Sequence, residues 1–136
     1  MRFSSFKWLV ILALAGLVLT ACNPNKPDLI PERRSGSQGA EGFCRTDDDG
    51  NLVVRVRNQT NFDNLNPSTT IVEFSPGTPQ SAVTAPMPGG SMTDVTFEFP
   101  AGCFNPDCDF TITVDANGDV DEGDEGNNTV AGTCIG

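Results

Sequence analysis

The stretch Val95-Thr96-Phe97-Glu98-Phe99 shows the pattern that decides the fold, because apolar and polar side chains alternate at every position. Successive side chains of a strand point to opposite faces of a sheet, so this alternation predicts a strand with one buried face. Short runs of the same kind recur at 52–57, 70–74 and 110–114, each bounded by turn residues. Because no helical periodicity separates them, the sequence predicts an all-β domain.

Three shorter segments, at 43–46, 81–84 and 129–134, complete a set of about seven strands. The economical architecture for that number is an antiparallel β-sandwich, in which two sheets pack face to face. The turn-rich stretches 47–51 and 88–91 supply the conformations that tight reversals need. We therefore expect one sandwich domain over residues 43–136.

The amino end has the form of an export signal. Arg2 and Lys7 precede the uncharged run 8–18, which is shorter than the roughly 20 residues that a membrane-spanning helix needs. The following Leu19-Thr20-Ala21-Cys22 resembles the lipobox of bacterial lipoproteins. The resemblance implies that residues 1–21 are a cleaved signal peptide and that lipid on Cys22 holds the mature chain to a membrane of the cell envelope. Asn23 stands where related lipoproteins carry an aspartate for inner-membrane retention, which favours the outer membrane in a Gram-negative cell and an extracytoplasmic face otherwise.

Residues 22–42 are predicted to be the lipidated cysteine and a flexible linker, because Pro, Gly and Ser are frequent there and few side chains could be buried. A flexible segment of this length has a root-mean-square span of about 25 Å. We therefore expect the domain to stand away from the lipid surface.

Four further cysteines fit an oxidising compartment: Cys44, Cys103, Cys108 and Cys134. They permit three connectivities, of which we favour Cys103 with Cys108, closing a short loop, and Cys44 with Cys134, joining the first predicted strand to the last. Zinc is the rival interpretation, but the chain has no histidine and no second closely spaced cysteine pair.

Three motifs together resemble the bacterial CARDB domain, a cell-adhesion-related module of immunoglobulin-like or fibronectin-like fold. They are the strand 54–59, the turn 88–91, and the stretch from Ile112-Thr113-Val114-Asp115 through Val120-Asp121-Glu122 to Glu125-Gly126-Asn127-Asn128. The family's usual Asn-x-Gly after the second strand appears here as Asn58-Gln59-Thr60, and the four extra cysteines are outside its general pattern. The resemblance implies a non-catalytic role in adhesion or protein contact.

The acidic segment 115–125 raises an alternative, a calcium-stabilised module. Its candidate ligands are Asp115, Asn117, Asp119, Asp121 and Glu122, and the acidic turn 47–49 could share a cation only if folding brings the two loops together. An EF-hand is excluded, since Val120 and Gly126 occupy the positions that need glycine and a bidentate glutamate. The competing interpretation is a hairpin with Asn117-Gly118 as a type I′ turn and Asn127 and Asn128 capping exposed backbone groups.

Composition argues against several other functions. The mature chain lacks histidine, tyrosine and tryptophan, which removes most hydrolytic machinery and the usual platform for stacking sugar rings. Residues 43–136 carry 15 acidic side chains and three arginines, so nucleic acid would be repelled. We expect no enzyme, no cofactor other than calcium, and two partners: the membrane, through the lipid, and another protein.

Overall fold

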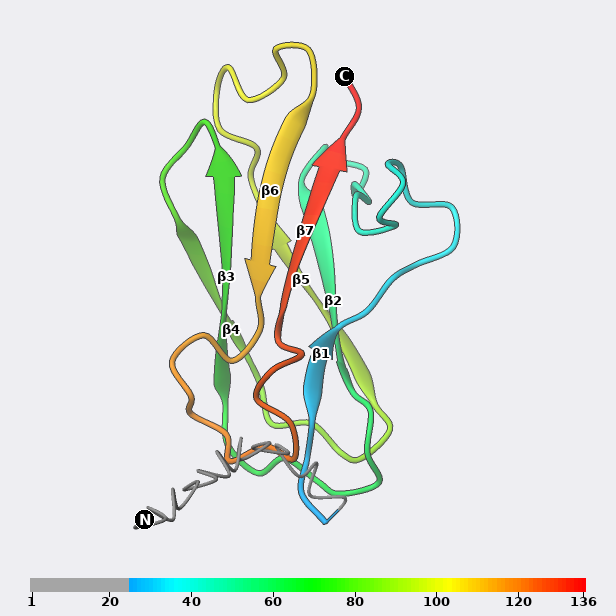
Figure 1. Cartoon of the computed structure of the whole chain (residues 1–136), viewed down its shortest axis with the longest axis vertical. Coiled ribbons are helices and arrows are strands. Elements are labelled where there is room, and N and C mark those ends of the chain that lie inside the picture. The colour runs from blue at the N-terminus through cyan, green and yellow to red at the C-terminus, as the bar shows by residue number, and fades with distance from the viewer. Residues whose placement is uncertain (1–24) are drawn as a thin grey trace, which may run out of the picture.

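The computed structural model describes residues 25–136, which form seven strands and no helix. The strands are β1 (Leu29–Pro31), β2 (Leu52–Asn58), β3 (Ser68–Ser75), β4 (Gln80–Thr84), β5 (Met92–Phe97), β6 (Cys108–Thr113) and β7 (Thr129–Cys134). They make two antiparallel sheets, one in the order β1-β2-β5 and the other in the order β4-β3-β6-β7 (Figure 1). The predicted immunoglobulin-like β-sandwich is confirmed.

Six of the seven predicted segments are strands of the sandwich. The clean alternation of 95–99 belongs to β5, which begins three residues earlier than predicted and pairs with β2, Val95 lying opposite Val54. The segment 43–46 was predicted as a strand, and this is wrong: only single bridges, Gln38 to Cys44 and Thr46 to Leu52, form there.

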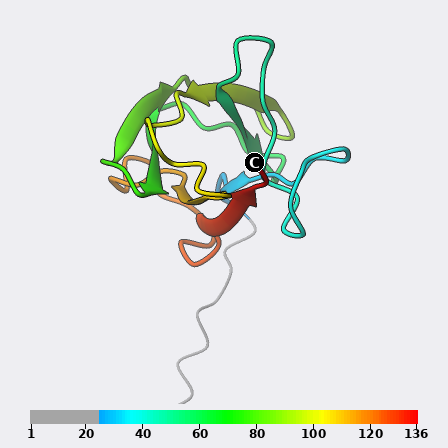
Figure 2. The ribbon, with the colours of Figure 1, turned by 90° about the horizontal axis from the view of Figure 1, so that it is seen from above.

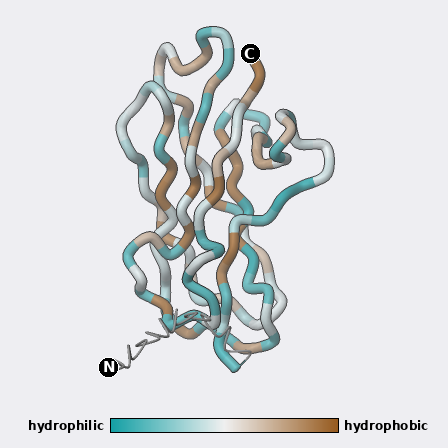
Figure 3. Tube along the Cα trace, in the orientation of Figure 1, coloured by the Kyte–Doolittle hydropathy of each residue, from teal (hydrophilic) through white to brown (hydrophobic). Residues whose placement is uncertain are grey.

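The core lies between the two sheets and is built from the inward side chains of their strands. Hydrophobic stretches follow the strands in Figure 3, and the fully buried side chains come from both sheets. Among those with at most 2% exposure are Leu29, Leu52, Val54, Val56, Val72, Ile112 and Val114. A close approach fixes one glycine, since a Cβ on Gly132 would lie 2.6 Å from the Phe110 ring across the β6–β7 pair. Burial of one contiguous core is the main driving force for this fold.

The domain begins earlier than the sequence predicted. Strand β1 lies within the predicted linker and pairs with β2, and its Leu29 is completely buried. The following segment is also held, by hydrogen bonds from Arg34 N to Gly42 O (3.1 Å) and from Gln38 N to Cys44 O (2.8 Å). The predicted boundary at residue 43 is therefore wrong. Three residues are too few to show a period, and the proline that ends β1 is tolerated because the strand is at an edge.

Two disulfides have the favoured connectivity. Cys44–Cys134 joins the segment before β2 to the end of β7, with 5.2 Å between the Cα atoms and 90 residues between the cysteines. Cys103–Cys108 closes the short loop before β6, with 4.9 Å between the Cα atoms. Lipidation at Cys22 and the signal peptide 1–21 concern residues outside the described part of the chain. Within residues 25–136, no helix is long and apolar enough to cross a membrane.

Candidate functional site

The acidic segment predicted as a possible metal site forms the connection between β6 and β7 at one end of the sandwich. We call this end, comprising residues 25–28 and 114–128, the acidic end. Figure 1 shows the connection in orange at the base of the molecule, beside the point where the chain enters β1. The described chain starts there, so the acidic end is also where any lipid on the amino terminus would hold the domain.

Asp115 organises the first half of this connection. Its carboxylate accepts hydrogen bonds from the backbone N–H groups of Asp119 (2.9 Å) and Val120 (3.1 Å), and it is 5% exposed. Its φ of 48° is left-handed, a conformation that aspartate tolerates better than most residues. Burial raises the pKa of Asp115, and the two N–H donors oppose that rise. Asp115 therefore shapes the loop around itself and inserts Val120 into the core.

The turn at Asn117-Gly118 is not the predicted type I′ hairpin. Gly118 N donates to Asp115 O at 2.9 Å, so the turn begins at Asp115, and the only non-glycine residue with positive φ in the described chain is Asp115. A type I′ turn needs positive φ at both central residues, which Asn117 does not have. The 15-residue connection is stabilised by buried side chains, whose positions no short-range turn rule could predict.

Glu122 is a buried residue of the acidic end, and its carboxylate joins two separate segments of the chain. Its Oε1 accepts from the Leu29 N–H of β1, its Oε2 accepts from Asn128 Nδ2, and the residue is 5% exposed. The Glu122 N–H donates to Glu125 Oε1 at 3.1 Å. Burial raises the pKa of Glu122 to about 7, with further increases from the nearby Asp115 and Glu125, while the bonds from Asn128 and Leu29 act in the opposite direction.

A second set of hydrogen bonds attaches the chain before β1. The Asp28 carboxylate accepts from Gln59 Nε2 (2.7 Å) and from Asn127 Nδ2 (3.0 Å). The buried Asn58 accepts from Asp28 N at 3.2 Å and donates to Phe62 O at 2.7 Å. Asn127 and Asn128 thus bind carboxylates, not exposed backbone groups as predicted. These polar residues hold β1 to the rest of the domain.

The predicted metal ligands separate into two groups. Asp115 and Glu122 come together with Glu125, and ligand oxygens of the three residues lie within 4.8 Å of one another. The others face elsewhere: Asn117 donates to Thr69 Oγ1 at 3.1 Å, Asp119 accepts from the same hydroxyl at 3.5 Å, and Asp121 pairs with Lys26 Nζ at 2.6 Å. Glu125 is the ligand candidate that the prediction omitted, although it lies in the same acidic run.

The side chains around the three carboxylates fit a divalent cation only in part. Calcium takes six to eight oxygen ligands, and the group offers three carboxylates and the Asn128 side-chain oxygen. That oxygen is buried in a residue 7% exposed and has no hydrogen-bond partner in the described structure. One observation argues against a resident ion: at least one oxygen of each carboxylate already accepts a hydrogen bond from the protein. If an ion bound, Asp115, Glu122, Glu125 and Asn128 would hold it and it would supply charge neutralisation.

The second acidic turn, 47–51, lies at the other end of the sandwich in Figure 1 and cannot share an ion with the first. Its Asp47 carboxylate accepts from Asp49 N (3.0 Å) and Asn51 N (2.8 Å), which lowers the pKa of Asp47, most strongly through Asn51. These bonds give it a purely local role as a turn former.

The comparisons with known proteins agree with this architecture. The CARDB family profile matches residues 26–132, so the chain belongs to the CARDB family, whose members are immunoglobulin-like, non-enzymatic and adhesion-related domains found in cell-surface proteins. The match begins at Lys26, in agreement with the early start of the domain. No curated protein matches the chain.

Two solved structures show the same fold. One is a domain of a protein described as a cell surface protein from Methanosarcina acetivorans, with 21% identity and a TM-score of 0.61, covering 81% of this chain and 91% of that one. The other is the CARDB domain of a Pyrococcus furiosus protein, described as being in complex with di-metal ions, with 19% identity and a TM-score of 0.56, covering 82% of this chain and 94% of that one.

Proposed function

We propose that this chain is a lipid-anchored envelope protein whose sandwich is a non-catalytic module for contact with another protein. The observation that carries the proposal is the short separation in sequence between the lipobox-like motif and the CARDB domain. Cys22 lies only four residues before Lys26, where the family match begins and whose side chain pairs with Asp121. Four residues span at most about 14 Å. Lipid at Cys22 would therefore hold the acidic end close to the membrane.

This placement directs the rest of the molecule outward. The loops 76–79, 98–107 and 47–51 lie at the opposite end from the acidic end in Figure 1 and would face away from the membrane. A rigid, disulfide-crosslinked sandwich presents such surfaces at a fixed height, which lowers the ordering cost of a protein contact.

Metabolic labelling with an alkyne fatty acid tests the anchor. The full-length chain, expressed in a bacterial host, should incorporate the label and fractionate with membranes, whereas Cys22→Ala should do neither. The control is Cys103→Ser/Cys108→Ser, which removes other sulfurs and should keep the label. Unlabelled wild-type protein in the soluble fraction would contradict the anchor.

Site-specific photocrosslinking tests the contact. A photoreactive residue at exposed Asp48, at the outer end, should give a discrete adduct with another envelope protein. The same residue at exposed Leu65 on the 59–67 loop, near the membrane end, should not. Adducts only at Leu65, or none at any exposed position, would contradict an outward-facing interaction module.

A second candidate function, stabilisation by calcium, is favoured by one observation: carboxylate oxygens of Asp115, Glu122 and Glu125 lie within 4.8 Å of one another. In support of it, the Pyrococcus furiosus relative is described with di-metal ions. Thermal melts with calcium and with a chelator test it. At a calcium concentration 100 times Kd, binding would add about 2.7 kcal/mol, a shift of several degrees in Tm. The shift should vanish in Glu125→Gln and persist in the control Asp121→Asn, whose carboxylate faces Lys26. No shift in the wild-type protein would exclude this function.

A further inference from the structure

Basic side chains gather on one flank of a strongly acidic domain. Residues 25–136 carry all 18 acidic side chains but only six basic ones, and five of these six lie together: Arg33, Arg34, Arg45, Arg55 and Arg57. Two follow β1, one precedes β2 and two are on β2. We call this group the arginine flank. Figure 2 shows the segment around residue 40 projecting from the body of the sandwich beside β1.

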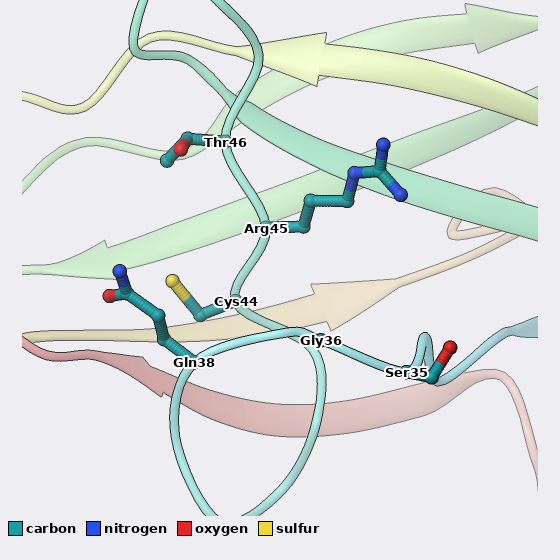
Figure 4. A pocket seen from close by; sticks show the side chains of 6 residues that line it. All are labelled: Ser35, Gly36, Gln38, Cys44, Arg45 and Thr46. Carbon is teal, nitrogen blue, oxygen red and sulfur yellow. The ribbon is translucent and has the colours of Figure 1, made fainter.

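Four of the arginines line one depression. Arg33, Arg34, Arg45 and Arg55 surround a cavity of about 310 Å³, and the acid Glu32, Ser35 and Met92 complete its lining. A neighbouring cavity of about 230 Å³ shares Arg45 and Ser35 and is drawn in Figure 4. In that view Arg45 and Ser35 extend to one side, while Gln38 and Thr46 extend to the other. Arg45 therefore lines both cavities.

The acids of the flank neutralise it only in part. Asp94 accepts two hydrogen bonds from Arg55, at 2.7 and 2.9 Å, and lies 3.3 Å from Arg34 Nη1. Glu32 accepts from Arg57 Nη1 at 2.8 Å. The five arginines of the flank therefore have only two carboxylates as ion-pair partners, those of Asp94 and Glu32.

Two arginines form no ion pair within 4 Å among the described residues, although the charge of Arg45, after the Arg55 hydrogen bond, is among the causes that lower the pKa of Asp94. Arg45 is exposed and makes no ion pair there, and Arg33 is exposed and lies over the Phe43 ring, 5.5 Å from its centroid. The repulsion is felt within the group, since burial first and then the charges of Arg55 and Arg45 lower the pKa of Arg34. An added anion would relieve this repulsion.

We propose that the arginine flank is a binding site for a short acidic segment of a partner protein, held by carboxylates on Arg33 and Arg45. The inference rests on the proposed function, because it names the chemistry of the protein contact. Asp94 shows that a carboxylate fits this surface, since it binds the Arg55 guanidinium through two parallel hydrogen bonds. Guanidinium groups present planar donor pairs that match carboxylates, and the cavity is at the small end of ligand-sized pockets.

The charge of the whole domain favours a short ligand over a long polyanion. Residues 25–136 carry a net charge of −12, so a polymer that extends past the flank meets repulsion from the surrounding acids. Screening confines each interaction to about 8–10 Å at physiological salt, so one or two carboxylates inside the depression experience mainly the arginines.

Fluorescence anisotropy with labelled hexaglutamate tests the proposal on the full-length chain in detergent micelles. Arg33→Gln/Arg45→Gln should weaken binding about threefold to tenfold, because two exposed ion pairs are lost. Neither residue is ion-paired within 4 Å, so Tm should fall by no more than a few degrees, through loss of the Arg33 contact with the Phe43 ring. The matched control is Lys26→Gln, which removes a basic side chain at the acidic end and should leave hexaglutamate affinity unchanged.

Three outcomes would overturn the proposal: no hexaglutamate binding at millimolar concentration, equal affinity in wild type and Arg33→Gln/Arg45→Gln, or tighter binding of inorganic polyphosphate or phosphatidylglycerol vesicles than of hexaglutamate. The Asp48 crosslinking experiment separates this failure from failure of the proposed function. If the envelope adduct forms while hexaglutamate fails to bind, the module contacts protein through another surface.

Discussion

The acidic end and the arginine flank both concentrate charge, but the charged groups are buried and hydrogen-bonded in the first and largely exposed in the second. At the acidic end, Asp115 and Glu122 are almost fully buried, and their carboxylate oxygens accept hydrogen bonds from backbone N–H groups of the same chain. On the flank, Arg33 and Arg45 are exposed and form no ion pair in the described structure. A dense run of like charges in sequence is therefore a poor indicator of function, because the denser run in this chain stabilises the fold.

Burial explains this contrast. A buried carboxylate is retained only when hydrogen bonds compensate for its lost hydration, so the buried acids must be satisfied by nearby donors. An exposed arginine remains hydrated and needs no partner, so its charge stays available for a ligand. Substitutions at the acidic end should therefore change stability, and substitutions on the flank should change binding.

The largest expected effect comes from the disulfide that secures the segment bearing the flank. Cys44→Ser/Cys134→Ser opens a crosslink spanning 90 residues and should lower the free energy of unfolding by about 4–5 kcal/mol in the chain-entropy model. Urea unfolding measures this loss in the free energy of unfolding. The matched control, Cys103→Ser/Cys108→Ser, opens a loop of about six residues and should cost about 2 kcal/mol. Equal losses would show that loop length does not govern the effect.

The next largest effect distinguishes two acids of the same loop. Asp115→Ala removes the acceptor for two backbone N–H groups, one of them on the buried Val120, and should cost about 2–3 kcal/mol by thermal or urea unfolding. Asp121→Ala removes an exposed carboxylate paired with Lys26 and should cost less than about 1 kcal/mol. If both variants lost the same stability, the structural role assigned to Asp115 would be wrong.

A smaller effect should depend on pH. The folded pKa of Glu122, about 7, exceeds the ordinary glutamate value of 4.5, so the folded state binds the extra proton. Its contribution is therefore present in acid and is lost as pH rises from about 4.5 through 7. Glu122→Gln should be more stable than the wild type at pH 8, on the order of 1–2 kcal/mol, and should lose that advantage at pH 5.

The comparison of the two proteins across pH isolates Glu122 from the rest of the charge. Acid also reduces repulsion among the other carboxylates, but it does so equally in both proteins. A stability difference that stays constant from pH 5 to pH 8 would contradict the raised pKa.

The smallest effect on stability is expected on the flank itself. Arg33→Gln/Arg45→Gln should lower the free energy of unfolding by no more than about 1 kcal/mol, since both side chains are exposed, neither is ion-paired, and the main interaction lost is the Arg33 contact with the Phe43 ring. Differential scanning calorimetry suffices to measure it. A loss above about 2 kcal/mol would place these arginines in the folding network and remove the contrast between the two regions.

Much of the fold follows from local pattern, and much of the site does not. Period-two alternation located four strands, shorter segments completing the set located two more, and the even cysteine count with loop length indicated the observed bridges. Strand β1 was missed because three residues between prolines carry no period, and it is held by Glu122 from 93 residues away. The arginine flank was missed because its members come from three chain segments that only the fold brings together.

Backbone amide NMR during a hexaglutamate titration tests the central claim most directly, since it observes both regions of the full-length chain at once. The account predicts concentration-dependent shifts in 32–46 and around Arg55, with the amides of 114–128 unmoved. Shifts confined to 114–128, or none in 32–46 at saturating peptide, would contradict it.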